Sequence, residues 1–470
     1  MSGADEAPTP CVIFMKLYDT IAAISTPRGK GGIAVIRISG EDAAAVLSRV
    51  FCPKGKSPTD HARRACFGNI IGPDGTVIDE GLVTYFAAPH SFTGENVAEI
   101  ACHGGVLLTE TVLGAVLAAG ARPATAGEFS ARAMLNGKMD LTSAEALGAL
   151  LEAGTQGQLA VARGGMEGKL AEATRALYER LAEILSDIYA RVDFPEEDLG
   201  SMSPEELRAA LLEVLGKTEA LAATWHTGRA VSDGVKTVIC GPVNAGKSTL
   251  YNAIVGHEAA IVTDIAGTTR DIISDTAALG NITLRLSDTA GLRETDDAVE
   301  KIGVARADAA MREAELVIAV LDASRAPDEG VLELLDRLRT LSATVIVVLN
   351  KQDRGDGFPR HVLENFEHVV ALSAKTGDIS PLSQLVERLY TSAAIDIRHD
   401  AVVANARQFA ALTRATEALN AAIAALDAGI PLDASCVEAE LALSAIGEVD
   451  GRAVGEDIVA NIFSRFCVGK

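Results

Sequence analysis

The chain has little positive charge and few aromatic residues. Its 470 residues include 42 lysines and arginines against 64 aspartates and glutamates, which gives a formal net charge of −22. This acidity disfavours a protein that holds nucleic acid over a broad basic surface, so any such contact must be local or shared with a partner. Aromatic residues make up only 4% of the chain, which does not favour a platform of stacked bases.

Closely spaced cysteine pairs and long apolar runs are also missing. None of the seven cysteines forms a Cys-x-x-Cys pair, so we expect a reducing, cytoplasmic setting with neither a zinc finger nor a disulfide framework. No apolar run approaches the ~18 residues that cross a membrane, which predicts no membrane span. The segment before Asp19 lacks a signal-peptide pattern, and Met15 is a candidate start.

The chain does contain a phosphate-binding loop in its central part. Residues 241–248 read Gly-Pro-Val-Asn-Ala-Gly-Lys-Ser and follow a run rich in β-branched residues at 235–240, which predicts a buried strand before the loop and a helix after it. In that context backbone N–H groups would surround the phosphates, Lys247 would reach the β and γ oxygens, and the Ser248 hydroxyl would ligate Mg²⁺.

Three further motifs each follow a strand-like run. Asp-Thr-Ala-Gly at 288–291 supplies a Walker-B aspartate for Mg²⁺ and a glycine turn toward the γ-phosphate. Asn-Lys-Gln-Asp at 350–353 ends in Asp353, whose carboxylate can accept hydrogen bonds from two guanine donors that adenine lacks. Ser-Ala-Lys at 373–375 completes the base pocket. Because ligands of open α/β sheets bind at the carboxyl ends of strands, the ordered set predicts a GTPase.

Two features indicate which kind of GTPase this is. Leu292 stands where Ras-like enzymes carry a water-orienting glutamine, so another polar residue must orient the water, and the nearest candidates lie within 293–300. Residues 263–271 read Thr-Asp-Ile-Ala-Gly-Thr-Thr-Arg-Asp, and their adjacent hydroxyls could place one oxygen on Mg²⁺.

The remaining sequence has two characters. Residues 19–135 alternate short β-rich runs with glycine and proline turns, which predicts a small α/β domain. From Leu141, and again from 401–412 to Phe466, apolar residues recur at a spacing near 3.6, which predicts helices. We expect the two helical parts to pack together, with the nucleotide domain inserted between them near residues 233 and 395.

These motifs resemble the tRNA-modification GTPases called MnmE or TrmE over nearly the whole chain. Besides the central motifs, the resemblance rests on N-terminal signatures and on the end Cys-Val-Gly-Lys at 467–470; the N-terminal signatures are residues 19–23, 31–40, 91–99, 103–105 and 122–129. Val243 replaces a second proline of the family, which puts little in doubt because no side-chain chemistry is expected there.

The resemblance implies a multidomain α/β plus all-α fold. It divides the chain into an N-terminal α/β domain for tetrahydrofolate binding and dimerisation at 1–136, helical parts at 137–232 and 395–470, and a Ras-like P-loop GTPase domain at 233–394 that is inserted into the helical bundle.

It also implies a potassium-dependent nucleotide site with Mg²⁺ on Ser248 and Thr269. The K⁺ ligands would be Asn244, Thr263, Ile265 and Thr268. This cation would supply the charge that an arginine finger supplies elsewhere, roughly 10³ to 10⁵ in rate. Glu300, twelve residues after Asp288, would activate the water, with help from Arg293. The nucleotide would contact Asn244, Ala245, Gly246, Lys247, Ser248, Thr249, Thr263, Asp264, Ile265, Ala266, Gly267, Thr268, Thr269, Asp288, Thr289, Ala290, Gly291, Asn350, Lys351, Asp353, Ser373, Ala374 and Lys375.

For the N-terminal domain, the resemblance implies that Arg37, Glu99, Lys138 and Lys470 bind 5-formyl-tetrahydrofolate or a related folate, and that Cys467 is a reactive thiol. Taken alone, each of the charged residues would be interpreted as a surface charge. The implied partners are a second copy of the chain, an MnmG-type protein dependent on FAD and NADH, and tRNA, whose wobble uridine is modified at C5. A regulatory or ribosome-assembly GTPase stays open as an alternative; such relatives share the central motifs but not the N-terminal signatures or the terminal Cys-Val-Gly-Lys.

Overall fold

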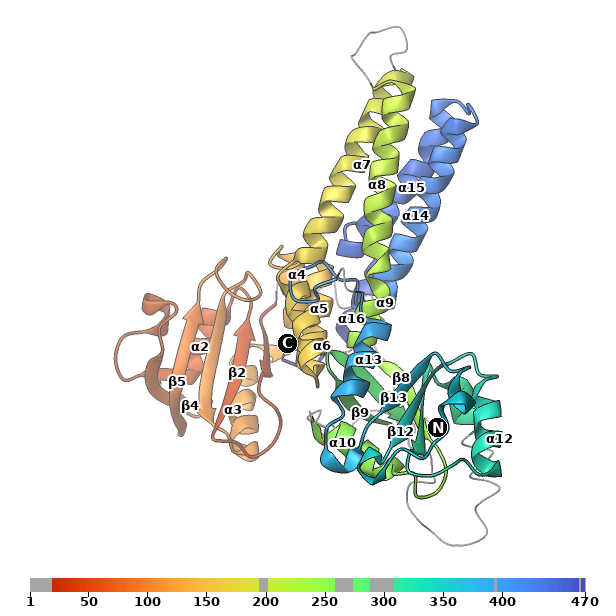
Figure 1. The fold of residues 1–470 in the computed structure, drawn as a ribbon. Helices are drawn as coiled ribbons and strands as arrows, with labels where there is room; N and C mark the ends of the chain where they lie inside the picture. The colour runs from red at the N-terminus through yellow and green to blue at the C-terminus, as the bar shows by residue number, and fades with distance from the viewer. Residues whose placement is uncertain are drawn as a thin grey trace, which may run out of the picture. The chain divides into compact units, whose positions relative to one another are not determined.

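The computed structural model describes residues 19–193, 202–257, 274–287, 308–392, 395–464 and 466–469. The chain forms two compact units (Figure 1). The first combines residues 1–148 with 450–470, and the second comprises residues 149–449.

The first unit is built on a seven-stranded sheet in the order β3-β4-β5-β6-β2-β1-β7. Side chains of successive residues point to opposite faces of this sheet. On β2, Ala34, Ile36 and Ile38 therefore lie on the same face, in an apolar core covered by two helices. The strands are β1 (Ile21–Ile24), β2 (Ile33–Ser39), β3 (Phe51–Pro53), β4 (Cys66–Ile71), β5 (Val77–Phe86), β6 (Val97–His103) and β7 (Arg122–Pro123), and the covering helices are α2 (Ala43–Val50) and α3 (Val106–Ala118).

Three further helices belong wholly or partly to this unit. They are α4 (Glu128–Leu135), α5 (Leu141–Glu152) and α16 (Glu456–Ser464), and a 3₁₀ turn, η1 (Pro58–His61), precedes β4. Ala131, Ala144, Val459 and Phe463 form a small core, so the end of the chain packs against segments more than 300 residues earlier.

The nucleotide-binding part of the second unit is a six-stranded sheet in the order β13-β12-β11-β8-β10-β9. All neighbours are parallel except β9 and β10, and apolar cores lie against both faces, which explains why β11 is buried along its whole length. The strands are β8 (Val235–Cys240), β9 (Ser274–Leu279), β10 (Ile282–Ser287), β11 (Leu316–Asp322), β12 (Thr344–Asn350) and β13 (His368–Ala371), with helices α10 (Lys247–His257), α12 (Glu329–Leu338) and α13 (Ser380–Tyr390) and 3₁₀ turns η2 (Gln352–Arg354), η3 (Arg360–Leu363) and η4 (Ala374–Thr376).

Helices from before and after this sheet form one bundle, as predicted. Leu181, Leu211, Leu412 and Ile446 lie in a single buried core, and α7, α8, α14 and α15 lie side by side (Figure 1). The helices are α6 (Gln156–Met166), α7 (Lys169–Asp193), α8 (Pro204–Ala223), α9 (Trp225–Ser232), α14 (Ala406–Asp427) and α15 (Leu432–Asp450). The nucleotide domain is therefore an insertion in a helical bundle.

The helical pattern expected from residue 401 begins later. Asn405 is extended, and its side-chain oxygen accepts a hydrogen bond from the Gln408 N–H at 2.9 Å, so α14 begins at Ala406. Before it, the Val403 N–H donates to the Thr224 hydroxyl at 2.9 Å. A side-chain cap and a contact with the end of α8 thus replace the first turn that apolar spacing predicted.

Hydrogen bonds join the inserted domain to the bundle. The Thr283 hydroxyl on β10 donates to the carbonyl oxygen of Val231 on α9 at 2.7 Å and lies 3.2 Å from the Thr155 hydroxyl. Arg229 on α9 forms an ion pair with Glu315, which lies directly before β11. The junction is thus held by polar contacts on β10 and directly before β11.

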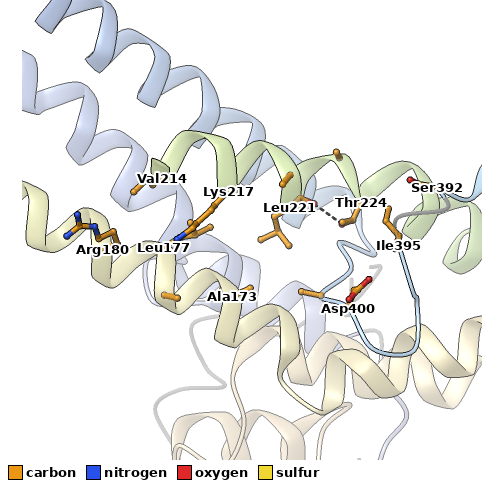
Figure 2. A pocket seen from close by; sticks show the side chains of 14 residues that line it. Ala173, Leu177, Arg180, Val214, Lys217, Leu221, Thr224, Ser392, Ile395 and Asp400 are labelled. Atoms are coloured by element: carbon orange, nitrogen blue, oxygen red, sulfur yellow. Dashed lines mark hydrogen bonds between the residues drawn. The ribbon is translucent and has the colours of Figure 1, made fainter. Parts of the chain in front are cut away.

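A cavity of about 740 Å³ lies where the chain returns from the inserted domain to the bundle (Figure 2). Leu177 on α7, Leu221 on α8 and Ile395 on the returning segment line it, and the Thr224 hydroxyl donates to the Leu221 carbonyl oxygen at 2.7 Å at its edge. Its lining residues all lie outside the nucleotide motifs.

Among the described residues, no helix is both long and apolar enough to span a membrane.

Candidate functional site

The phosphate-binding loop connects β8 to α10 and is attached to the base-recognition strand. Gly246 adopts a left-handed φ of +98°, and a Cβ there would lie 2.2 Å from Nδ2 of Asn350, so no larger residue fits. The same Asn350 amide donates to the Ala245 carbonyl oxygen at 2.9 Å. The first and third motifs, more than 100 residues apart, therefore meet.

Lys247 lies half-buried at the start of α10, with its ammonium on the loop. Its Nζ donates to the carbonyl oxygens of Gly241 at 3.0 Å and Pro242 at 2.9 Å, and burial lowers the pKa of this lysine. A half-buried ammonium that donates to neutral carbonyls suits an incoming phosphate, whose negative charge would favour the charged form of the lysine. Ser248 and Thr249 follow it in the first turn of α10, where free backbone N–H groups favour anions.

Asn244 occupies the exposed tip of the loop. Its φ of +62° is left-handed, a conformation that asparagine tolerates better than most residues. Ala245, which follows it, is fully buried, so the loop is fixed on one side of Asn244 while the amide of Asn244 stays accessible to a ligand.

The two base-recognition motifs are also brought together. Asn350 Oδ1 accepts a hydrogen bond from the Ala374 N–H at 2.8 Å, and the Ser373 hydroxyl donates to Asp353 at 2.6 Å. That hydrogen bond lowers the pKa of Asp353, so its carboxylate stays ionised as a guanine acceptor. Lys375 is exposed in η4. Parallel pairing of β12 with β13 places the two motifs at the same sheet edge.

Asp322 is a residue of this site that the sequence motifs do not reveal. It ends β11 in register with Asn350, and Nζ of Lys351 donates to its Oδ2 at 2.7 Å. Burial alone would raise the pKa of Asp322, but hydrogen bonds from Lys351 and Ser324 outweigh burial and hold it at about 2. The one available signal was an acidic residue at the end of the apolar run 316–322.

Several predicted site residues lie outside the described residues, and their roles stay predictions. They are Thr263, Asp264, Ile265, Ala266, Gly267, Thr268, Thr269, Asp288, Thr289, Ala290, Gly291, Arg293, Glu300 and Lys470.

In the first unit, Arg37 and Glu99 face each other across neighbouring strands. They are register partners on β2 and β6, and the guanidinium Nη2 lies 2.9 Å from Oε1 of Glu99. The guanidinium also lies over the rings of Phe92 and Phe129, 5.2 Å and 5.7 Å from their centres. Two opposite charges therefore lie beside aromatic rings, an arrangement that can contact both the polar groups and the rings of a ligand.

The C-terminal tail lies beside this pair. Val468 forms an antiparallel bridge with Ala126, and the Gly469 carbonyl oxygen accepts hydrogen bonds from the Ser25 hydroxyl at 3.2 Å and from Arg37 at 3.5 Å. A Cβ at Gly469, whose φ is +100°, would lie 2.4 Å from the Ile24 carbonyl oxygen. Only glycine permits this close approach.

Lys138 and Cys467 complete the described part of this candidate site. Nζ of Lys138 donates to the Pro89 carbonyl oxygen at 3.1 Å, and Cys467 is an exposed free thiol in the tail. The structure therefore places the tail beside the Arg37–Glu99 pair and places Lys138 against the loop after β5.

A buried charge network supports the same region. Arg132, 1% exposed, donates to Asp19 at 2.8 Å and to Glu128 at 3.0 Å, and its other terminal nitrogen lies 3.2 Å from Glu95. Burial would raise the pKa of Glu128, but hydrogen bonds from Arg122, the Thr125 N–H and Arg132 hold it at about 2. Sequence reasoning did not identify this network, although three of its carboxylates lie in the N-terminal signatures.

Comparison with known proteins gives matches over nearly all of the chain. Residues 20–138 match the family described as GTP-binding protein TrmE N-terminus, and residues 141–467 match the MnmE helical domain. The tRNA modification GTPase MnmE of Chloroflexus aurantiacus is 42% identical over 97% of this chain and 100% of its own length. That of Symbiobacterium thermophilum is 41% identical over 96% and 99%.

Among solved structures, a variant of Aquifex aeolicus Era bound to GDP and AlF4⁻ is 25% identical over 39% of this chain and 66% of its own, with a TM-score of 0.26 that is too low to support an argument. The full-length relatives decide the family. With its phosphate and base motifs assembled at one sheet edge, the chain belongs to the MnmE family of tRNA modification GTPases and is a GTP hydrolase.

Proposed function

We propose that this GTPase depends on potassium and works with an MnmG-type flavoprotein that uses FAD and NADH. Together they would form the aminomethyl or carboxymethylaminomethyl group at C5 of the wobble uridine of certain tRNAs. The observation that carries the proposal is the tail at Gly469, held beside Arg37 in a chain that also contains an assembled nucleotide pocket.

In the nucleotide site, each residue has a separate task. Lys247 and the backbone N–H groups at the start of α10 hold the phosphates, and the Asp353 carboxylate accepts from guanine. Mg²⁺ bound by Ser248 and Thr269 would neutralise developing phosphate charge. The position of Ser248 in the first turn of α10 fits that ligand role.

The potassium dependence rests on Asn244. Its amide oxygen lies at the exposed tip of the loop, and with oxygens of Thr263, Ile265 and Thr268 it would hold a monovalent cation that adds positive charge beside the phosphates. Glu300 would orient and deprotonate the attacking water, with Arg293 supporting its loop.

Steady-state GTP hydrolysis in KCl and in NaCl at equal ionic strength tests this proposal. We expect faster hydrolysis in KCl, and we expect Asn244→Ala to lose this preference and Glu300→Ala to lose most activity in both salts. Val243→Ala is the matched control, because Val243 is 77% exposed on the same loop and has no oxygen in its side chain. Equal wild-type rates in the two salts would eliminate the potassium site.

In the first unit, the proposed ligand is 5-formyl-tetrahydrofolate or a related one-carbon donor. Glu99 would accept hydrogen bonds from the aminopyrimidine ring, and Arg37, Lys138 and Lys470 would meet the carboxylates. The close Arg37–Glu99 pair supports this, because it offers both partner types in one place. Cys467 is the proposed thiol nearby.

Calorimetric titration of the full chain with 5-formyl-tetrahydrofolate tests the folate site. We expect saturable binding that Glu99→Gln weakens and that Gly469→Ala also weakens, because the added Cβ would displace the tail from Ile24. Gly75→Ala is the control for glycine replacement, since its φ of +81° is also positive, no atom lies within 4 Å of a Cβ there, and it lies in the turn between β4 and β5. Absence of binding by the wild type would remove the folate site from the proposal.

We also propose a cytoplasmic homodimer that forms through the first unit. Exposed apolar side chains at Ile33, Val106 and Leu107, 69%, 49% and 78% exposed, support a protein contact there. GTP binding and hydrolysis would bring the two nucleotide domains together and release them. Small-angle scattering in GDP, and in GDP with aluminium fluoride and K⁺, should then give different profiles, and identical profiles would contradict the proposal.

A further inference from the structure

An unusual basic segment lies at the free edge of the first sheet, between β3 and β4. Residues 52–67 contain Lys54, Lys56, Arg63 and Arg64 but only one carboxylate, in a chain whose net charge is −22. A pocket of about 340 Å³ lies here, lined by Lys54, Lys56, His61, Arg64 and Phe67. The acidity of the chain makes this local concentration of cations stand out.

Two of these cations are available to an anionic ligand. Lys56 and Arg64 are exposed, and within the described part of the chain no carboxylate lies within ion-pair distance of either. By contrast, Lys54 is paired with Glu80, and Arg63 donates to the His90 carbonyl oxygen at 3.2 Å. The free pair is held by the 3₁₀ turn η1, which begins with Pro58 and separates Lys56 from Arg64.

An exposed aromatic ring lies beside the cations. Phe67 is 48% exposed, and the Lys54 ammonium lies 5.0 Å from its ring centre. Its register partner Leu82 is 46% exposed, so both apolar side chains are partly open to solvent. A ring next to unpaired cations can stack a base while the cations contact phosphates. This is a single stacking position and not the aromatic platform that the composition disfavours.

This segment shares a sheet face with the candidate folate site. Phe67, Leu82 and Ala101 are register partners on successive strands, and Ala101 and Glu99 lie two residues apart on β6, so their side chains lie on the same face. Phe67 and Arg37 are separated by three strand spacings of about 4.8 Å each and by an offset of two residues, about 7 Å, along the strands, which together give roughly 16 Å. A nucleotide held at the edge could therefore place another nucleotide of the same strand near the Arg37–Glu99 pair.

We propose that residues 54–67 bind an unpaired segment of tRNA, with Lys56 and Arg64 on phosphates and Phe67 stacked on one base. The proposal rests on the proposed function, because tRNA is the RNA concerned. So acidic a chain would then contact RNA through a local patch, where repulsion from the remaining surface is screened beyond about 8 to 10 Å.

Fluorescence anisotropy of a labelled, unmodified tRNA transcript with the full-length protein tests the site. Lys56→Ala with Arg64→Ala should weaken binding about tenfold or more and reduce the slope of log K against log salt by roughly 1.4, since each single-strand phosphate contact contributes about 0.7. Phe67→Ala should weaken binding by about fivefold to 150-fold, and Phe67→Tyr should restore it. Arg163→Ala with Arg175→Ala, two exposed cations of the bundle, is the control for lost charge.

The outcomes separate this inference from the proposed function. If the patch variants bind tRNA as tightly as the wild type does, the inference about residues 54–67 is wrong, but tRNA stays a partner. If the wild type binds no tRNA, both this inference and the proposed tRNA partner are wrong. A patch variant whose molar mass by light scattering falls to that of a monomer, with tRNA binding unchanged, would instead assign this surface to a second copy of the chain. Unchanged thermal unfolding of the variants establishes that exposed residues were altered without loss of the fold.

Discussion

At the scale of single residues, the nucleotide pocket depends on a few polar side chains at strand ends. Asn350 binds the phosphate loop through Ala245 and the second base motif through Ala374, so one amide connects three motifs. Asp322 holds Lys351, whose left-handed φ of +65° turns the chain toward η2. Asn350 and Asp322 are both buried or nearly so, which makes their hydrogen bonds costly to lose.

Asp322→Ala should weaken GDP binding about tenfold. The substitution removes a charged hydrogen-bond partner of Lys351, a loss of about 1.5 to 3 kcal/mol where the group is buried, part of which reaches the ligand. Titration with a fluorescent GDP analogue measures the change. Asp336→Ala, an exposed carboxylate of α12, should leave the affinity unaltered, and an equal effect of both variants would contradict a specific role.

The charge network of the first unit predicts a pH dependence. The folded pKa of Glu128, about 2, lies below its ordinary value of 4.5, so its contribution is present above about pH 4.5 and is lost as the pH falls toward 2. A shift of this size corresponds to about 3 kcal/mol.

Hydrogen exchange of peptides from residues 19–148 at pH 5 and pH 3 measures this effect. The opening free energy should fall with the pH in the wild type and fall less in Glu128→Gln, which has no carboxylate to protonate. Glu110→Gln, an exposed residue of α3, should follow the wild type. A slope that Glu128→Gln does not flatten would assign the acid sensitivity to other groups.

At the scale of elements, strand ends position the chemistry and helix faces form the bundle. The parallel strands β8, β11, β12 and β13 end at one edge; a nucleotide motif lies at the end of three of them, and β11 ends in Asp322. The helices α7, α8, α14 and α15 bury one apolar face each in a common core.

Leu412→Ala should destabilise the bundle by about 2 to 5 kcal/mol. Leu412 is fully buried in that core, and truncation leaves a cavity. Trp225, the one tryptophan of the chain, stacks on Phe409 of α14 with ring centres 5.2 Å apart, so its fluorescence reports urea unfolding of this region. Leu441→Ala, 55% exposed on α15, is the matched control. Equal midpoints for the two variants would contradict the assigned core.

At the scale of the whole molecule, the junction between β10 and α9 offers a route by which the inserted domain can influence the bundle. Val231 lies in the last turn of α9, where helix carbonyls have no partner within the helix, and the Thr283 hydroxyl supplies one. A movement of β10 on nucleotide binding would therefore act directly on the end of α9.

Thr283→Val should weaken this coupling while keeping the shape of the buried side chain. The unpaired carbonyl would cost about 1 to 3 kcal/mol locally, so hydrogen exchange of residues 225–232 should accelerate and respond less to GDP. Thr416→Val is the control, because that hydroxyl bonds within α14, to the Leu412 carbonyl oxygen. If GDP altered exchange in α9 equally in the wild type and Thr283→Val, the junction would not carry the signal.

The sequence by itself determined the GTPase chemistry, the family and most of the element types. Those depend on local patterns: β-branched runs before Gly241, Asn350 and Ser373, and 3.6-residue periodicity in the helices. The apolar spacing predicted a helix from residue 401, but α14 begins at Ala406 because the side chain of Asn405 caps the helix there.

Only the tertiary structure decided which distant groups meet. Ser25 and Gly469 bond across 444 residues, Asp322 holds Lys351 because two strands are parallel and in register, and Phe67 shares a face with Arg37 through three strand pairings. Such contacts follow from sheet order and register, which no local sequence pattern specifies.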